Sequence, residues 1–259
     1  MLSPPALAGA ALAVAALSCG EVPTLPDGIA YISPVLLPSP AVAVGDTLRD
    51  SLGQAAPLRI VGIGNAGDTI SGIAPTYVVT TVPGKTITIA PGDFVIGDSV
   101  RPVQIVGRVG DRLQTPPVTL DVVQQPDSIG AASDTVAVFP LPGTGEVSSS
   151  VALGVTVSSG ATGTRAGVKS IIVRYRITNV YPADASIPDT TLVLVDASNR
   201  FADSTGLTAV DTTDASGNAS RSIRSIPFGF DSVEIRATAN DLKGVLLRGS
   251  PIRFVVSTR

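Results

Sequence analysis

The sequence contains no histidine and no tryptophan, and only one cysteine and one methionine among 259 residues. The lack of histidine excludes a Ser-His-Asp or Cys-His nucleophile, a histidine general base and any His-ligated zinc. A single cysteine can form neither an intramolecular disulfide nor a multi-cysteine metal site. Most familiar enzyme designs are therefore excluded, and we expect a protein that is not an enzyme and uses no cofactor.

Charge is also scarce, because charged residues make up 15% of the chain and hydrophobic residues 44%. The apolar content is sufficient for a core. The formal net charge of -3 provides no basic surface for a phosphate backbone, so we expect no nucleic-acid partner. Several arginines of the second half stand singly among apolar residues, which is typical of a solvated strand face: Arg174, Arg176, Arg221, Arg224 and Arg236.

The N-terminus has the features of an export signal. Residues 6–17 are apolar or small and uncharged, a length that matches a signal-peptide core and is too short to span a bilayer. The only cysteine follows in Ala16-Leu17-Ser18-Cys19, which resembles a bacterial lipobox. The resemblance implies a signal peptide at 1–18 and a diacylglycerol on Cys19 that holds the protein at a membrane. An ordinary secretory signal with an incidental cysteine is the alternative.

Beyond the signal, the sequence pattern predicts an all-β protein. Five prolines between residues 20 and 40 favour an extended leader at 19–40. Apolar side chains then recur at every second position, as at 151–157, 171–177 and 233–237, with turn residues between such runs. In this alternation Glu234 falls on a solvent face. The aromatic residues that fall on core positions are Tyr77, Phe94, Tyr175 and Phe254.

The length of the chain predicts two β-sandwiches. One immunoglobulin-like sandwich needs about 100 residues, so the chain after the leader accommodates two. The polar, proline-containing segment Gln124-Gln125-Pro126-Asp127-Ser128 is the expected boundary. We therefore expect one domain at 41–125 and a second at 126–259, with the excess length of the second in loops at 161–166 and 179–189.

Two segments resemble bacterial immunoglobulin-like domains. The segment at 42–47, Val-Ala-Val-Gly-Asp-Thr, with Leu48 and Leu52, resembles the opening strand and turn of such domains. The hairpin at 213–219, Thr-Asp-Ala-Ser-Gly-Asn-Ala, and the later strand at 233–239 resemble the invasin and intimin type of repeat. The resemblance implies extracellular structural or adhesive modules without catalytic residues. Such modules recognise a protein or glycan ligand at loop tips or sheet edges.

The most tempting candidate site is a set of acidic residues in the second half. Calcium prefers several carboxylate and carbonyl oxygens from loops, and the candidates are Asp196, Asp203, Asp211 and Asp214. A hairpin turn explains Asp214, Gly217 and Asn218 equally well without a metal. The glycines at 62, 64, 67 and 72 are followed by neither a helix nor a suitable lysine, so no phosphate site is expected.

These features together predict an exported, lipid-anchored cell-envelope protein with tandem Ig-like modules, which acts as a structural or adhesive scaffold. Two other functions remain open. One is a carbohydrate-binding or accessory module of an extracellular enzyme, and the other is a periplasmic subunit of envelope assembly. A cleft with converging carboxylates would favour the first. A large exposed apolar patch would favour the second.

Overall fold

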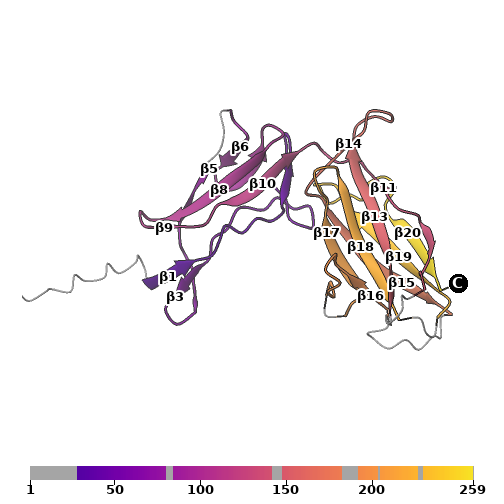
Figure 1. Ribbon diagram of the computed structural model, residues 1–259. Helices are drawn as coiled ribbons and strands as arrows, with labels where there is room; N and C mark the ends of the chain where they lie inside the picture. The colour runs from indigo at the N-terminus through magenta and orange to yellow at the C-terminus, as the bar shows by residue number, and fades with distance from the viewer. Residues whose placement is uncertain are drawn as a thin grey trace, which may run out of the picture.

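The computed structural model describes residues 28–79, 84–141, 148–182, 192–203, 205–226 and 230–258. The predicted signal peptide at 1–18 and Cys19 lie outside these ranges. The described residues form β-strands joined by turns and contain no α-helix, so the predicted all-β class is confirmed. Figure 1 shows that the strands gather into two groups, which we call the N-terminal region (28–123) and the C-terminal region (128–258).

The N-terminal region consists of one larger sheet and two smaller ones. The larger sheet has the order β2-β10-β8-β5, with β9 paired to β8 and with β2 parallel to β10. The smaller sheets are β1-β3-β4 and β6-β7. Leu48, Val95, Ile105 and Leu120 are fully buried in the core between them. The strands are β1 (Ile29–Ile32), β2 (Ala41–Ala43), β3 (Gly62–Gly64), β4 (Thr69–Ile70), β5 (Pro75–Val79), β6 (Ile87–Ala90), β7 (Phe94–Gly97), β8 (Pro102–Val109), β9 (Leu113–Gln114) and β10 (Val118–Val123).

The C-terminal region is a sandwich of two sheets. One sheet has the order β11-β13-β18-β16, with β14 paired to β13, and the other has the order β12-β20-β19-β15-β17. The strands are β11 (Ser128–Ala131), β12 (Val136–Val138), β13 (Ser149–Ser159), β14 (Ala166–Gly167), β15 (Ile172–Tyr181), β16 (Leu192–Val195), β17 (Thr208–Thr212), β18 (Asn218–Ser225), β19 (Ser232–Ala239) and β20 (Ile252–Ser257).

The strand order of the C-terminal region is that of an immunoglobulin-like sandwich. Strands β11, β13, β18 and β16 occupy the places of A, B, E and D, and β15, β19 and β20 occupy those of C, F and G. Strands β16 and β17 lie between β15 (C) and β18 (E) in the chain and belong to opposite sheets. Strand β16 pairs with β18, and the following β17 pairs with β15. The chain therefore crosses from one sheet to the other and back before β18 begins.

The alternation seen in the sequence explains the packing of this sandwich. On β13, Leu153, Val155 and Val157 are fully buried, whereas the side chains between them are not. On the opposite sheet, Tyr175 and Phe254 lie in the same core, as predicted. The Tyr175 hydroxyl donates a hydrogen bond of 3.1 Å to the carbonyl oxygen of Ala219 on β18, so the phenol links the two sheets without an unpaired buried group. Tyr77 and Phe94, also predicted for a core, are half-buried.

The second half of the expected leader belongs to the N-terminal region. Strand β1 pairs with β3, and Ile29 and Val35 are buried in the N-terminal core. Leu36 forms a bridge to Arg59 further along the chain. Residues 28–40 are thus folded against the first group of strands, because apolar side chains between the prolines reach its core.

The two regions meet at a short junction. Only residues 124–127 connect β10 with β11, and Ala41 and Val123 of the N-terminal strands are buried with the C-terminal core. The Lys169 ammonium lies 2.6 Å from the Asp121 carboxylate, which also accepts a hydrogen bond from the Ser170 hydroxyl. These contacts join side chains of β10 to the segment that precedes β15.

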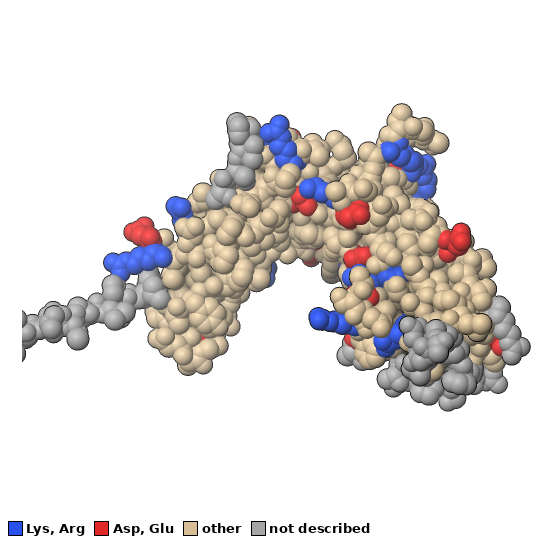
Figure 2. All heavy atoms as spheres, in the orientation of Figure 1, with Lys and Arg blue, Asp and Glu red and all other residues tan. Residues whose placement is uncertain are grey.

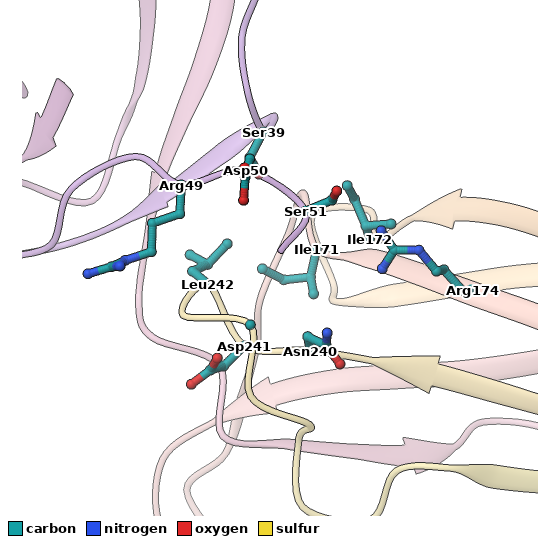
Figure 3. A pocket seen from close by; sticks show the side chains of 11 residues that line it. Ser39, Arg49, Asp50, Ser51, Ile171, Ile172, Arg174, Asn240, Asp241 and Leu242 are labelled. Carbon is teal, nitrogen blue, oxygen red and sulfur yellow. The ribbon is translucent and has the colours of Figure 1, made fainter. Parts of the chain in front are cut away.

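Two loops press against each other at the same junction. The loop at 50–54 is closed by backbone N–H groups that donate to the Asp50 carboxylate, and the loop at 241–245 is closed in the same way around Asp241. Figure 3 shows the two loops facing each other. A Cβ atom added to Gly53 would lie 2.2 Å from the Lys243 carbonyl oxygen, so backbone touches backbone here. The junction, defined as these loops together with residues 121–127 and 169–170, leaves little free space.

Candidate functional site

The outer face of the β12-β20-β19-β15-β17 sheet carries a concentration of positive charge. Arg176 on β15 lies directly opposite Arg236 on β19, and Arg236 lies opposite Arg253 on β20. Arg174 is two residues along β15 and therefore points to the same face. We call these four arginines, together with Glu234 on β19, the arginine face. Elsewhere charges are mixed, and the view in Figure 2 shows acidic and basic side chains scattered between uncharged ones.

Glu234 lies on the outer face, as alternation predicts, but it is buried beneath two of these arginines, so its expected exposure to solvent is wrong. The residue is 3% exposed. Its carboxylate accepts a hydrogen bond of 2.9 Å from Nε of Arg236 and lies 2.8 Å from a guanidinium nitrogen of Arg253. The Thr178 hydroxyl contacts the same residue next to a β-bulge in β15. Alternation placed Glu234 on the outer face correctly, but the long arginine side chains cover it there.

The arginines keep the buried carboxylate charged. Burial raises the pKa of Glu234. Hydrogen bonds from Arg236 and Arg253 and the positive charge of Arg253 together lower the pKa by more than burial raises it, so that it lies below the ordinary value of 4.5. A group whose pKa is lower in the folded than in the unfolded state stabilises the fold above its unfolded pKa. Glu234 therefore stabilises the folded protein at neutral pH, and this contribution is lost as the pH falls through the pKa that Glu234 has in the folded state.

We expect Glu234→Gln to remove this pH-dependent contribution. The variant leaves Arg236 and Arg253 without their anion, so its melting temperature should be lower than that of the wild type at neutral pH. The difference should shrink as the pH falls from about 5 through the lowered pKa, because the wild-type carboxylate then also becomes neutral. Thermal unfolding followed by circular dichroism between pH 3 and 7 measures the difference in melting temperature between the wild type and the variant. A difference that stays constant over this range would contradict the assignment.

The single carboxylate does not balance the charge of the arginine face. It pairs with Arg236 and Arg253, whereas Arg174 and Arg176 are exposed and form no ion pair with any acid that the structure describes. Like charges directly opposite each other on neighbouring strands destabilise a sheet. The row of three arginines is therefore an arrangement that folding alone does not favour. Arg253 was not singled out by the sequence, and its partners become visible only once three strands are in register.

The four aspartates proposed for calcium each have local hydrogen-bond partners, and Asp196, Asp203 and Asp214 close turns. The carboxylate of Asp196 accepts hydrogen bonds from the N–H groups of Ser198 and Arg200, and that of Asp214 from Ser216 and Asn218. The backbone hydrogen bond from Arg200 is the main cause that lowers the pKa of Asp196. These two carboxylates therefore close the turns that the sequence also explained without a metal.

The other two aspartates have local partners as well. Asp203 accepts hydrogen bonds from the Thr208 hydroxyl and from Thr205, and these lower its pKa. Asp211 accepts from the N–H of Ser220 and pairs with Arg221 at 3.2 Å. In the described part of the chain, no three acidic or cysteine side chains gather into a group that could hold a metal ion. Calcium binding stays a prediction, which a fall in melting temperature on addition of EDTA would support.

Two cavities among the described residues are open to solvent. A cavity of about 40 Å³ at the junction is lined by residues of both regions, including Asp50, Ile171, Arg174 and Asp241 (Figure 3). This volume suits about one water molecule. A larger hollow of about 430 Å³ lies beside the β8–β9 hairpin and is lined by Thr76, Arg108, Gly110, Asp111, Arg112, Leu113 and Gln114. It is built from one hairpin and one neighbouring strand.

No family model matches the chain, and no curated protein matches it by sequence. Among solved structures, the adhesin InvE of Yersinia pseudotuberculosis is 14% identical, with 87% of this chain and 57% of that chain covered and a TM-score of 0.36. Domains 4 and 5 of the S-layer protein SbsC are 11% identical, with 88% and 96% covered and a TM-score of 0.28. The D00-D0 domain of intimin is 13% identical, with 88% and 98% covered and a TM-score of 0.27.

These structures are of adhesins and surface-layer proteins, and this chain spans 57% of the InvE structure. TM-scores this low carry no argument, so the immunoglobulin-like assignment rests on the strand order of the protein itself. Among the residues that can be described, no helix is long and apolar enough to cross a membrane.

Proposed function

We propose that this protein is an exported, lipid-anchored component of the cell envelope that acts as a rigid structural or adhesive scaffold. In this proposal two Ig-like domains, divided near residue 125, form the scaffold, and the first also includes residues 28–40. The observation that carries the proposal is the junction, where a connection of four residues and two closely packed loops join two sets of sheets. A joint of this kind holds binding surfaces at a fixed distance and angle from an anchor.

Packing contributes more to this rigidity than charge. The Lys169–Asp121 pair is partly exposed, with side-chain exposures of 32% and 16%, and partly exposed ion pairs are worth about 0–1 kcal/mol. The burial of Ala41 and Val123 with the C-terminal core restrains the ends of two strands more strongly. The hydrogen bond of 3.1 Å from the Gln125 amide to the Asp241 carboxylate then ties the connection itself to the second region.

Sheet edges of the scaffold support recognition of a protein ligand. Strand β12 lies at the end of its sheet and pairs only with β20 among the described strands. Val136 and Val138 on this strand are 73% and 54% exposed. An extended ligand strand could pair with this edge and cover the two valines, which is recognition by β-augmentation.

Membrane anchoring is tested by changing the proposed lipid acceptor. We expect Cys19→Ala to move the protein from the membrane to the soluble fraction, because acyl chains supply about 0.8 kcal/mol of membrane affinity for each buried CH₂ group. Labelling of cells with a palmitate analogue, followed by fractionation, measures both effects. Ser18→Ala retains the acceptor and should still be labelled. Unchanged partitioning of Cys19→Ala would refute the anchor.

The scaffold function is tested on whole cells. Cells that lack the protein should adhere less to immobilised extracellular glycans or proteins, and the wild-type chain should restore adhesion. Cys19→Ala should not restore it, because the scaffold would leave the cell. Unchanged adhesion and an unchanged envelope in the deletion strain would contradict the proposal.

A further inference from the structure

We propose that the arginine face binds a linear, carboxylated polysaccharide, a chain of uronic acid residues, laid across strands β15, β19 and β20. This inference deepens the scaffold proposal, on which it rests for its biological setting, by naming a ligand class and the residues that hold it. Carboxylates on the side of the ligand that faces the sheet would pair with arginines of the row Arg176, Arg236 and Arg253, and Arg174 would add a further positive charge beside the row.

The charge of the face supports an anionic ligand. Four arginines share this face with one buried carboxylate, which contacts Arg236 and Arg253. Arg174 also lines the junction cavity together with Asp50 and Asp241. In a chain whose formal net charge is -3, positive charge is therefore concentrated here against the overall trend. Arg174 and Arg176 are exposed and free of ion pairs with described acids. Each guanidinium has five N–H donors in a planar fork that fits a carboxylate. Glu234 uses only part of this capacity in Arg236 and Arg253.

Glu234 also prepares the row for a ligand. Its buried carboxylate contacts the guanidiniums of Arg236 and Arg253 at 2.9 and 2.8 Å and therefore fixes two long side chains that would otherwise move freely. Side chains that are ordered before binding lose less conformational entropy when the ligand arrives. A buried acid beneath exposed arginines thus stabilises the geometry of the row at the same time as it leaves the face positive.

The position of the row favours a polysaccharide over a peptide. An extended peptide adds to a sheet by pairing its backbone with a free edge strand. Strands β15, β19 and β20 lie inside their sheet, each with a paired neighbour strand on both sides. A polysaccharide needs no sheet edge, because its carboxylates reach the guanidinium groups directly. The row therefore fits a ligand that is held by its charged groups and not by backbone pairing.

The surroundings of the row disfavour the other common polyanions. The row ends at Thr208 on β17, which is paired with Arg176, and the row itself contains no aromatic side chain on which nucleic-acid bases could stack. The exposed ring of Tyr181 lies beyond the row on β15, and the formal net charge of -3 disfavours a nucleic acid as well. It lies across the middle strands of a sheet face, whereas contact with an anionic membrane generally uses basic clusters on helices or beside anchors. Binding without stacking is mainly ionic and should weaken as salt screens the charges.

The test is a binding measurement with the full chain and polygalacturonate at low ionic strength, by biolayer interferometry. We expect binding that weakens as sodium chloride is raised, and no binding of dextran, a neutral polysaccharide. Arg176→Gln should raise the Kd about tenfold, the change expected for the loss of one charge-assisted hydrogen-bonded contact. The combined change of Arg174→Gln and Arg176→Gln should raise it further. Both side chains are exposed, so the melting temperature should not fall.

A matched control separates the row from charge in general. Arg59→Gln removes an exposed arginine of the N-terminal region and should leave the Kd within about twofold of the wild-type value. Three results would overturn the inference: no binding of polygalacturonate, equal effects of the Arg59 and Arg176 changes, or tighter binding of poly-L-glutamate or of phosphatidylglycerol vesicles. Such a failure would leave the scaffold proposal standing, because fractionation and cell adhesion test it without polygalacturonate.

Discussion

Phe254→Ala is expected to lower the free energy of unfolding of the C-terminal region by about 3–5 kcal/mol. Phe254 is 0% exposed on β20 and lies beside Ile235 of β19 in the core between the two sheets. Removal of the ring takes away buried apolar surface and leaves a cavity that the surrounding sheets fill only in part. Urea unfolding followed by far-UV circular dichroism measures the change.

The neighbouring residue provides the control for this substitution. Val255 follows Phe254 on β20 but points to the outer face and is only partly buried. Val255→Ala should therefore cost less than about 1 kcal/mol. Equal losses for the two variants would contradict the two-sheet core described here, because they would show that side chains on the two faces of β20 are equally important.

Gly53→Ala is expected to separate the two loops at the junction and to alter the relative orientation of the two regions. Gly53 has a positive φ of 77°, a conformation that L side chains rarely adopt. The new Cβ would also lie 2.2 Å from the carbonyl oxygen and 2.6 Å from the carbonyl carbon of Lys243. Both contacts are with backbone, which cannot rotate out of the way, so one loop has to move.

Gly67→Ala is the matched control for this junction variant. Gly67 has a φ of 82° in the turn between β3 and β4, but a Cβ there would meet no atom within 4 Å. Both variants carry the strain of a left-handed residue, about 1–2 kcal/mol, and only Gly53→Ala adds the clash. Small-angle X-ray scattering should show a changed particle shape for Gly53→Ala and an unchanged one for Gly67→Ala. An unchanged shape for Gly53→Ala would contradict the close contact of the loops.

The sequence predicts much of the fold because alternation is a local property. Strand β19 covers the predicted run at 233–237, and the apolar positions at 151–157 lie on the core face of β13. The glycine of the hairpin at 213–219 is required as predicted, since Gly217 has a φ of 80°. Such features depend on neighbours within a few residues and are therefore readable without coordinates.

Features that depend on distant strands could not be predicted. The parallel pairing of β2 with β10 and of β12 with β20 joins segments far apart in the chain. Phe94 was expected in the core, but on β7 it is Val95 that is fully buried. In a strand this short, alternation leaves the choice between the two faces open, and the choice is made by packing against the rest of the sheet.

The candidate site was the least predictable part of the protein. Single arginines on separate strands look like ordinary solvated residues, and only the register of β15, β19 and β20 brings Arg176, Arg236 and Arg253 into one row. Glu234 is an acid between two core residues in the sequence, and nothing local indicates that arginines cover it. Three of the aspartates that did stand out in the sequence, Asp196, Asp203 and Asp214, close turns instead, because Asp is favoured there by its hydrogen bonds to backbone N–H groups. The fourth, Asp211, pairs with Arg221.

A fixed junction between two sets of sheets is the central claim, and residual dipolar couplings test it most directly. Backbone couplings measured for the N-terminal and C-terminal regions in one weakly aligned sample give an alignment tensor for each. If the junction is rigid, the two tensors agree in magnitude and orientation. Tensors of clearly different magnitude would show that the regions move independently and would contradict the account.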